Sequence, residues 1–138
     1  MVFLFKFLCM KLALRPIGYV SSPLTDPALA PKQGTEGGPA AWIDIREEFA
    51  DALDGLRVGQ NVILITWLHR GERSVLKVHP RDDLAAPMKG VFATRSADRP
   101  NPLGLHPVTI LRMEGRRIEV SPLEAVDGTP VVDIKPAL

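Results

Sequence analysis

Short runs of β-branched and apolar residues, each ended by proline or glycine, recur along most of this chain. Thirteen prolines and eleven glycines spread over 138 residues exclude long helices and favour short strands. The segment 62–68 is apolar at nearly every position, which is typical of a strand buried on both faces. The stretch 22–39, with four prolines, predicts a long loop, and loops of this length in compact domains are usually functional. The predicted strands span residues 17–21, 41–45, 62–68, 75–79, 91–94, 108–112, 118–122 and 131–134.

One segment, IREEFADAL, has the period of a helix instead. Phe49, Leu53 and Leu56 fall on one face of this helix. Asp44 is placed to cap its first turn, and Gly55 is placed to end it. Many short strands with one short helix predict a mainly β fold, in the form of a small single-sheeted β-barrel.

Length and composition indicate a soluble globular protein of one domain. The chain has 46% hydrophobic and 24% charged residues, the usual balance of such a domain. Seventeen Lys and Arg against sixteen Asp and Glu give a net charge of +1, so binding of nucleic acid requires a local basic patch. The lone Cys9 excludes an intramolecular disulfide and a CxxC site, which favours a reducing, cytoplasmic location.

The first residues, MVFLFKFLCMKLAL, are apolar but do not predict a membrane anchor. Lys6 and Lys11 interrupt the run, which is shorter than the roughly 20 apolar residues that a spanning helix needs. No small-x-small cleavage motif precedes Arg15, so a signal peptide is not expected either. We interpret residues 1–14 as an N-terminal arm or an over-extended start, and residues 15–138 as the domain.

Several common catalytic motifs are absent from the sequence. No GxGxxG follows a predicted strand and no GxxxxGK[ST] occurs, so a Rossmann dinucleotide site and a P-loop are excluded. No GxSxG motif supports a serine nucleophile. His69, His79 and His106 lack the paired spacing of metal ligands. A hydrolytic metal site that these three form in space with Asp127 stays an alternative.

The segment richest in chemical groups is 90–107, GVFATRSADRPNPLGLHP. The predicted strand 91–94 delivers Arg95 to its end, and two prolines stiffen the loop that follows. Such a loop can hold the side chains of Arg95, Arg99 and Asn101 in a fixed arrangement. An Arg in this arrangement can bind a carboxylate or phosphate through two hydrogen bonds. The alternative is a plain solvated turn, but the density of Arg, Asn, Pro and Gly favours preorganised binding.

A second polar segment is VDGTPVVDIKP, near the end of the chain. Asp127 and Gly128 predict a tight turn, and Thr129 and Pro130 predict extended backbone that leads into a strand. The turn is either a plain chain reversal or a place where backbone amides and the Asp127 carboxylate face a ligand.

Five motifs together resemble the TsaA-like family: IGYVSSP, PKQG, LH at Leu68 and His69, GVFATRS-DRPNPLGL, and DGTPVVDIKP. They run from Ile17 to Pro136. The resemblance implies a small β-barrel that binds S-adenosylmethionine outside the Rossmann plan, as a homodimer with its sites near the subunit interface. It also implies a methyltransferase that needs no metal. Its substrate is threonylcarbamoyladenosine, the nucleotide that follows the anticodon in tRNA, which is methylated on N6.

Given the reaction that the resemblance implies, we hypothesise which residues act in it. Asp127 and His69 are both candidates for accepting a proton, and the choice between them stays open. Arg99 and Asn101 are the candidates for contact with RNA or with the threonyl carboxylate. The cofactor-binding residues that the family resemblance implies are Pro31, Lys32, Gln33, His69, Arg70, Arg95, Leu105, Asp127, Gly128, Thr129 and Pro130.

The sequence departs from the family at several positions. Lys32, Arg70 and Ala137 stand where related enzymes often have Arg, Gln and Tyr. Longer members also continue beyond the DIKP motif into a further small domain. The alternative function is therefore a non-catalytic regulatory module that binds S-adenosylmethionine and transfers nothing.

Overall fold

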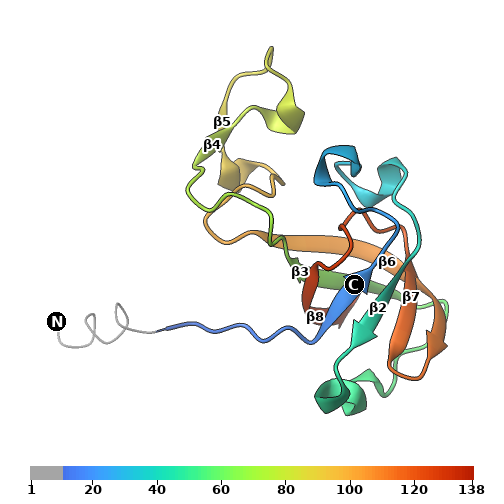
Figure 1. Cartoon of the computed structure of the whole chain (residues 1–138). Helices are drawn as coiled ribbons and strands as arrows, with labels where there is room; N and C mark the ends of the chain where they lie inside the picture. The colour runs from blue at the N-terminus through green and yellow to red at the C-terminus, as the bar shows by residue number, and fades with distance from the viewer. Residues whose placement is uncertain (1–10) are drawn as a thin grey trace.

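Six strands close into a barrel in which each strand pairs with two antiparallel neighbours, in the order β1-β2-β7-β6-β3-β8 (Figure 1). The computed structural model describes residues 11–138, so most of the expected arm lies outside the described residues. The prediction of a mainly β barrel is confirmed. The barrel strands are β1 (Gly18–Ser21), β2 (Ala41–Ile45), β3 (Asn61–Trp67), β6 (Leu103–Glu114), β7 (Arg117–Ser121) and β8 (Pro130–Pro136).

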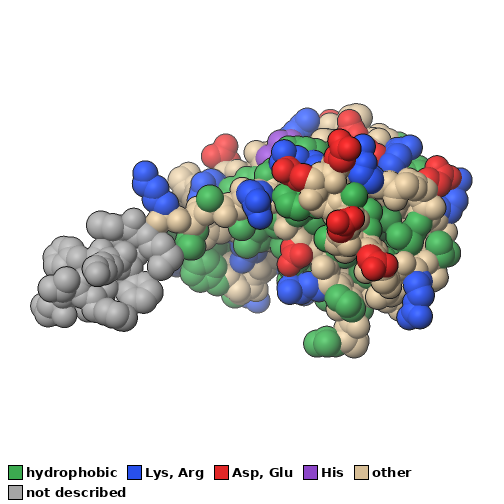
Figure 2. Space-filling model, turned by 90° about the horizontal axis from the view of Figure 1, so that it is seen from below, with side chains coloured by type: hydrophobic (Ala, Val, Ile, Leu, Met, Phe, Trp, Pro, Cys, Tyr) green, Lys and Arg blue, Asp and Glu red, His purple; other side chains and the backbone are tan. Residues whose placement is uncertain are grey.

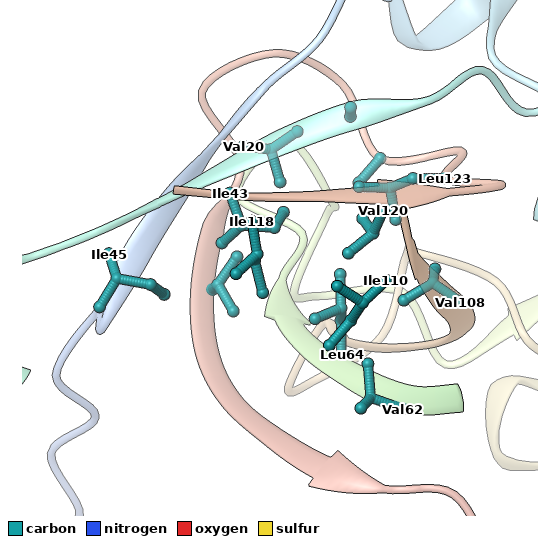
Figure 3. Close-up of a cluster of buried hydrophobic side chains, with 13 residues drawn as sticks. Val20, Ile43, Ile45, Val62, Leu64, Val108, Ile110, Ile118, Val120 and Leu123 are labelled. Atoms are coloured by element: carbon teal, nitrogen blue, oxygen red, sulfur yellow. The ribbon is translucent and has the colours of Figure 1, made fainter. Parts of the chain in front are cut away.

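The inward-facing side chains fill the barrel. Along β3, Val62, Leu64 and Thr66 are buried, whereas the residues between them are only half-buried. The prediction that this strand is buried on both faces is therefore wrong, because the wall of a barrel has one inner and one outer face. Burying each Val, Ile or Leu side chain stabilises the fold by roughly 1.5–3 kcal/mol relative to exposing it. The core comprises Val20, Ala41, Ile43, Ile45, Val62, Leu64, Val108, Ile110, Ile118, Val120, Leu123, Ala125 and Val131 (Figure 3).

The antiparallel topology sends three connections to the same end of the barrel. Strands β1, β3 and β7 run toward this end, and β2, β6 and β8 leave it. The connections are the β1–β2 loop (22–40), the β3–β6 loop (68–102) and the β7–β8 loop (122–129). We call this the loop end. The opposite end carries the connection 46–60 and the two-residue turn between β6 and β7.

The β3–β6 loop contains a small hairpin that projects away from the barrel (Figure 1). Its strands β4 (Lys77–Val78) and β5 (Lys89–Gly90) pair with each other, and the 3-10 turn η4 (Pro80–Asp82) lies between them. The predicted strand 91–94 is wrong, because Val91–Ala93 form the 3-10 turn η5. Only Val91 of this turn is buried, and Phe92 is 84% exposed, so the apolar run does not mark a strand.

The predicted helix is present as the 3-10 helix η3 (Glu47–Leu53) at the opposite end. Phe49, Leu53 and Leu56 pack against the core as expected, and Gly55 follows the helix with a φ of +94°. The predicted cap at Asp44 is wrong, because Asp44 belongs to β2 and its carboxylate accepts a hydrogen bond from Arg117. Two shorter 3-10 turns, η1 (Pro27–Leu29) and η2 (Gly34–Glu36), interrupt the β1–β2 loop.

Strand β6 is longer than the predicted 108–112, because residues 103–107 also pair with β3. In the sequence, the glycine and proline of LGLHP are residue types typical of a loop. Strand β7 ends at Ser121, opposite Thr109, so residues 103–107 have a strand neighbour on one side only. Proline is tolerated at such an edge because it lacks an N–H to donate.

No helix among residues 11–138 is long and apolar enough to cross a membrane. The face in Figure 2 carries Lys and Arg beside Asp and Glu, in keeping with the net charge of +1.

Candidate functional site

The loop end gathers most of the residues that the sequence singles out. Its three connections come from different strand pairs, and only the closed barrel brings them together. Leu105 lies within β6 and Pro130 begins β8. The other predicted cofactor residues lie in the loops: Pro31, Lys32 and Gln33 in β1–β2; His69, Arg70 and Arg95 in β3–β6; Asp127, Gly128 and Thr129 in β7–β8.

Both the side chain and the backbone of Asp127 join the β7–β8 loop to the β1–β2 loop. The carboxylate of Asp127 accepts a hydrogen bond of 3.0 Å from the N–H of Ser22. The N–H of Asp127 donates to the carbonyl of Leu24 at 2.6 Å. The predicted turn is confirmed, with Gly128 at a φ of +80° and the hydroxyl of the buried Thr129 donating to the Val126 carbonyl. One carboxylate oxygen of Asp127 is thus used to hold the loops, and the side chain is exposed at the surface.

Arg70 ties the β3–β6 loop to the same place. Its guanidinium donates to the carbonyl of Thr25 at 3.3 Å, and the neighbouring His69 is exposed. One residue further on, a methyl group built on Gly71 would lie 3.1 Å from Cβ of Pro102 and would collide with the carbonyl of Ala97. The segment after β3 therefore packs closely against the loop that precedes β6.

Arg99 and Arg95 have different surroundings within that loop. The half-buried Arg99 donates to the backbone carbonyls of Val91, Thr94 and Ser96 at 3.0–3.1 Å. Its guanidinium holds the loop in shape, and its contact with RNA stays a prediction. The side chain of Arg95 is exposed and makes no hydrogen bond or ion pair with any described residue.

Asn101 has a partner that the sequence did not indicate. Its side-chain oxygen accepts a hydrogen bond of 3.1 Å from Arg73, which also donates to the carbonyl of Pro100 at 2.7 Å. The guanidinium of Arg73 lies over the ring of Trp67, 5.1 Å from its centroid. No local pattern marks Arg73, since its partners come from the end of β3 and from the far end of the loop.

Two ion pairs link the β1–β2 loop to the projecting hairpin. Lys32 pairs with Asp82, and Arg81 pairs with Glu36 at 2.6 Å. The hydrogen bond from Lys32, together with its positive charge, lowers the pKa of the Asp82 carboxyl. Arg81 and Asp82 both adopt left-handed backbone, with φ of 55° and 59°, which is uncommon for residues other than glycine. Of these four, the sequence indicated only Lys32.

Leu105 lies on the outside of the barrel and is 50% exposed. It pairs with Ile65 across β3 and β6, and Leu103 pairs with Trp67 in the same register. The next outward pair along the two strands, Ile63 and Pro107, is apolar as well. We call this surface the β3–β6 outer face, and it comprises Ile63, Ile65, Trp67, Leu103, Leu105 and Pro107.

The three histidines do not converge. His69 is exposed, His79 hydrogen-bonds the carbonyl of Ala86 at 3.0 Å, and His106 points into the barrel beside Thr66 and Glu124. Within residues 11–138, no group of three His, Cys, Asp or Glu side chains is arranged to hold a metal ion. The structure therefore does not support the metal-hydrolase alternative.

The described geometry defines a class: a six-stranded antiparallel barrel whose three loops are hydrogen-bonded together at one end, beside an apolar outer face. Residues 19–138 match the tRNA-methyltransferase O N-terminal domain family, and the chain belongs to that family. The TsaA-like resemblance is thereby confirmed.

Curated relatives and solved structures support the same family. A probable S-adenosyl-L-methionine-binding protein of Methanothermobacter thermautotrophicus is 42% identical, and the match covers 92% of this chain and 90% of the relative. An S-adenosyl-L-methionine-binding protein of Archaeoglobus fulgidus is 41% identical, with 88% and 86% covered.

Two crystal structures of TrmO are also similar to this chain. One has 32% sequence identity and a TM-score of 0.76. The other, from Pseudomonas aeruginosa, has 30% identity and a TM-score of 0.73. Both matches cover 94% of this chain but only 58% and 57% of the solved chains. The chain thus spans little more than half the length of the TrmO proteins that it matches.

Proposed function

We propose that this protein binds S-adenosylmethionine at the loop end and methylates N6 of threonylcarbamoyladenosine next to the tRNA anticodon. One observation carries the proposal: direct hydrogen bonds join the three loops into one surface. The carboxylate of Asp127 accepts a hydrogen bond from the N–H of Ser22, and the guanidinium of Arg70 donates one to the carbonyl of Thr25. These bonds connect the loops that carry the segments assigned to the cofactor by the family resemblance, although the bonded residues lie up to 105 positions apart in the chain. Two close relatives are named S-adenosyl-L-methionine-binding proteins.

The residues present suit this cofactor. Arg95 offers a guanidinium without a protein partner in the described residues, which matches a carboxylate. The second oxygen of Asp127 can accept a hydrogen bond from a hydroxyl or an amine, and Gly128 has no side chain to block a close approach. Leu105 supplies exposed apolar surface for a purine ring. The bound cofactor supplies a methyl group that its sulfonium makes electrophilic.

The protein's own side chains enclose the site, accept the proton and contact the substrate. Lys32 and Gln33 close over the site from the β1–β2 loop, and Thr129 and Pro130 frame it from the start of β8. Methylation of N6 releases a proton, for which Asp127 and His69 are both exposed candidates. Asn101 and Arg99 are the candidates for contact with the threonyl carboxylate or the RNA backbone, although Arg99 would have to do so with donors not already used in the loop.

The β3–β6 loop provides the local basic excess that tRNA binding requires. Residues 68–102 contain seven Lys and Arg against four Asp and Glu, whereas the whole chain is nearly neutral. Basic side chains near the site can pair with phosphates. The basic residues of this loop are Arg70, Arg73, Lys77, Arg81, Lys89, Arg95 and Arg99.

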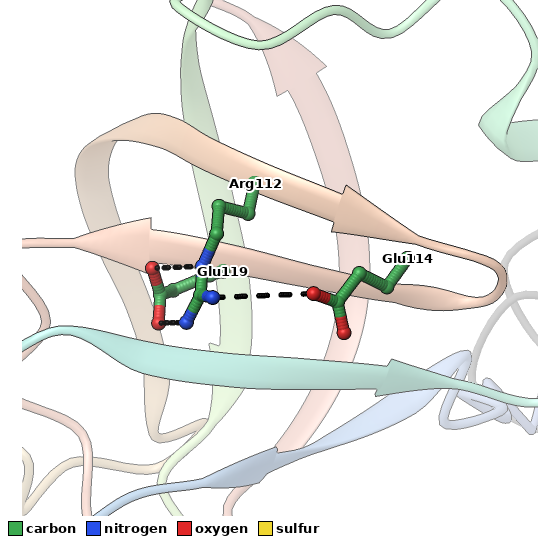
Figure 4. Close-up of polar contacts among 3 residues, drawn as sticks. All are labelled: Arg112, Glu114 and Glu119. Carbon is green, nitrogen blue, oxygen red and sulfur yellow. Dashed lines mark hydrogen bonds and ion pairs between the residues drawn. The ribbon is translucent and has the colours of Figure 1, made fainter.

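A homodimer forms part of the proposal, and the two sides of the barrel differ in a way that supports it. On one side, Arg112 pairs with Glu119 at 2.9 Å and lies near Glu114, so charges cover the strands (Figure 4). Arg112 and Arg117 also lie over the ring of Trp42, at 4.9 and 4.6 Å from its centroid. The β3–β6 outer face consists of uncharged residues, with Arg73 over the ring of Trp67 at one edge. A second copy on this face would bury it and bring Leu105 to the interface.

A turnover assay tests the reaction. Transfer of labelled methyl groups from S-adenosylmethionine is measured on tRNA that carries threonylcarbamoyladenosine and on the same tRNA without this group. We expect transfer to the modified tRNA only. Arg95→Ala should reduce it at least about tenfold through loss of one charged contact, while the surface variant Arg112→Ala retains it. Equal transfer by wild type and Arg95→Ala would remove Arg95 from the site.

The second candidate is a non-catalytic module that binds the cofactor. It is favoured by the names of two relatives, which describe binding of S-adenosyl-L-methionine and no methyl transfer. Calorimetric binding of S-adenosylmethionine without any methyl transfer to total tRNA would establish this alternative.

A further inference from the structure

A chain of polar side chains, formed by the buried Thr66 and His106 and the partly buried Glu124, crosses the inside of the barrel at the loop end. His106 is only 3% exposed. Its Nε2 lies 2.7 Å from the hydroxyl of Thr66 on β3, and its Nδ1 lies 2.5 Å from Oε1 of Glu124 in the β7–β8 loop. Both ring nitrogens of His106 thus have a hydrogen-bond partner, one on β3 and one in the β7–β8 loop. The apolar core surrounds this chain, where polar groups stabilise the fold only if they are fully paired.

Gly104 fixes the position of this imidazole. A methyl group built on Gly104 would lie 2.6 Å from Nε2 of His106 and 2.6 Å from the hydroxyl of Thr66. The backbone of β6 therefore lies directly against the contact between these two side chains. The ring has hydrogen-bond partners at both nitrogens and backbone at its side, and so it holds Glu124 in one place.

The other oxygen of Glu124 faces the β1–β2 loop. A methyl group built on Gly34 would lie 2.9 Å from Oε2 of Glu124 and 2.9 Å from the carbonyl of Pro122. The N–H of Leu123 donates to the carbonyl of Pro39 at 2.9 Å. The β1–β2 loop thus rests on the start of the β7–β8 loop, with the Glu124 carboxylate beneath Gly34. Gln33, the last of the proposed cofactor residues in this loop, immediately precedes Gly34.

We propose that Glu124, held by His106, is a positioning residue that sets the conformation of the β1–β2 loop for binding of S-adenosylmethionine. The proposal rests on the proposed function, since it takes Pro31, Lys32 and Gln33 as part of the cofactor site. Glu124 itself need not touch the cofactor. The polar chain links both strands that flank the β3–β6 loop to the other two loops, so it sets the relative placement of all three.

The test compares the full-length wild type with Glu124→Ala and Gly34→Ala. The first variant removes the carboxylate, and the second pushes the loop away while Glu124 and His106 stay in place. Gly34→Ala leaves the barrel interior unchanged, so it keeps the test available if Glu124→Ala does not fold. Glu119→Ala is the matched control, because that carboxylate lies five residues earlier and pairs with Arg112 on the outside. Calorimetry gives the affinity for S-adenosylmethionine, and hydrogen exchange reports on the loop.

We expect both variants to bind S-adenosylmethionine about tenfold or more weakly, because the apparent affinity falls with the fraction of molecules in which the loop holds the binding conformation. The amides of Glu36 and Gly38, which donate to the carbonyls of Gln33 and Gly34, should exchange faster. Amides of β2 and β7 should keep their protection, and Glu119→Ala should match the wild type. Glu124→Gln, which keeps an oxygen for His106, should restore most of the affinity.

Two results would overturn the proposal. The first is unchanged loop exchange in both variants, whatever the affinity. The second is faster exchange throughout the barrel, because Glu124 would then support the whole fold rather than the loop. A wild type that does not bind S-adenosylmethionine contradicts the proposed function instead, and loop exchange still decides whether Glu124 positions the loop.

Discussion

The carboxylate of Asp127 accepts a hydrogen bond of 3.0 Å from the backbone N–H of Ser22, a residue 105 positions earlier in the chain. The next contact, from the N–H of Asp127 to the carbonyl of Leu24, runs in the opposite donor direction. The two loops are therefore joined through both backbone and side chain. Asp127 has a structural task at the site in addition to any contact with a ligand.

Replacing Asp127 tests its structural task. Asp127→Ala should lower the free energy of unfolding by about 1 kcal/mol, because the Ser22 N–H loses its acceptor. Asp127→Asn should retain most of this stability, since an amide oxygen can accept the same bond. Urea unfolding measures both variants, with Asp51→Ala in η3 as a control at the opposite end. Equal stability of the Ala and Asn variants would show that the hydrogen bond contributes nothing.

Replacing Arg99 should lower the stability of the fold much more than replacing Arg95. Arg99→Ala removes the donors to three backbone carbonyls and should cost about 1.5–3 kcal/mol of stability. Arg99→Lys should not restore it, because a single ammonium cannot replace the planar fork of a guanidinium. Arg95→Ala should change stability by less than about 0.5 kcal/mol, as at most exposed positions. Thermal and urea unfolding check the stabilities, and the expectation is wrong if Arg95→Ala proves the less stable of the two Ala variants.

The ion pair between Lys32 and Asp82 should depend on pH. Lys32 lowers the pKa of the Asp82 carboxyl below its ordinary value of 3.8. The pair is therefore present at neutral pH, and its contribution is lost as the pH falls through the lowered folded-state pKa. Carboxyl carbon NMR should show the Asp82 midpoint rising in Lys32→Met. Because both side chains are exposed, about 1 M salt should raise the wild-type midpoint as well. Identical midpoints in wild type and Lys32→Met would refute the pairing.

The β3–β6 outer face should determine the oligomeric state. Leu103 is 42% exposed and pairs with Trp67 at the edge of this face. Leu103→Glu should raise the dimer dissociation constant about tenfold or more, because it places an unpaired charge in an apolar interface. Light scattering after size exclusion measures the mass, and Val58→Glu is a control at the opposite end, where Val58 is 62% exposed. A wild type that is monomeric at all concentrations would exclude the dimer.

Short-range patterns in the sequence determined most of the strands. Ala41–Ile45 has the predicted bounds, and five other barrel strands lie where apolar runs end at proline or glycine. The failures occur where tertiary surroundings decide. Residues 91–93 have strand-like composition but no barrel neighbour, and they form a 3-10 turn instead. Gly104 and Pro107 are residue types typical of loops, yet they belong to β6 because β3 pairs with them.

The sequence by itself also predicted which residues make up the candidate site, since the family resemblance assigns them by position along the chain, and their roles stay predictions. Only the tertiary structure decided what those side chains contact. It directs Arg99 toward backbone carbonyls, leaves Arg95 exposed, and places Glu124 beneath Gly34. The physical reason is that local patterns report burial and turn geometry over a few residues. Contacts between Ser22 and Asp127, or between His106 and Glu124, exist only after the barrel has closed.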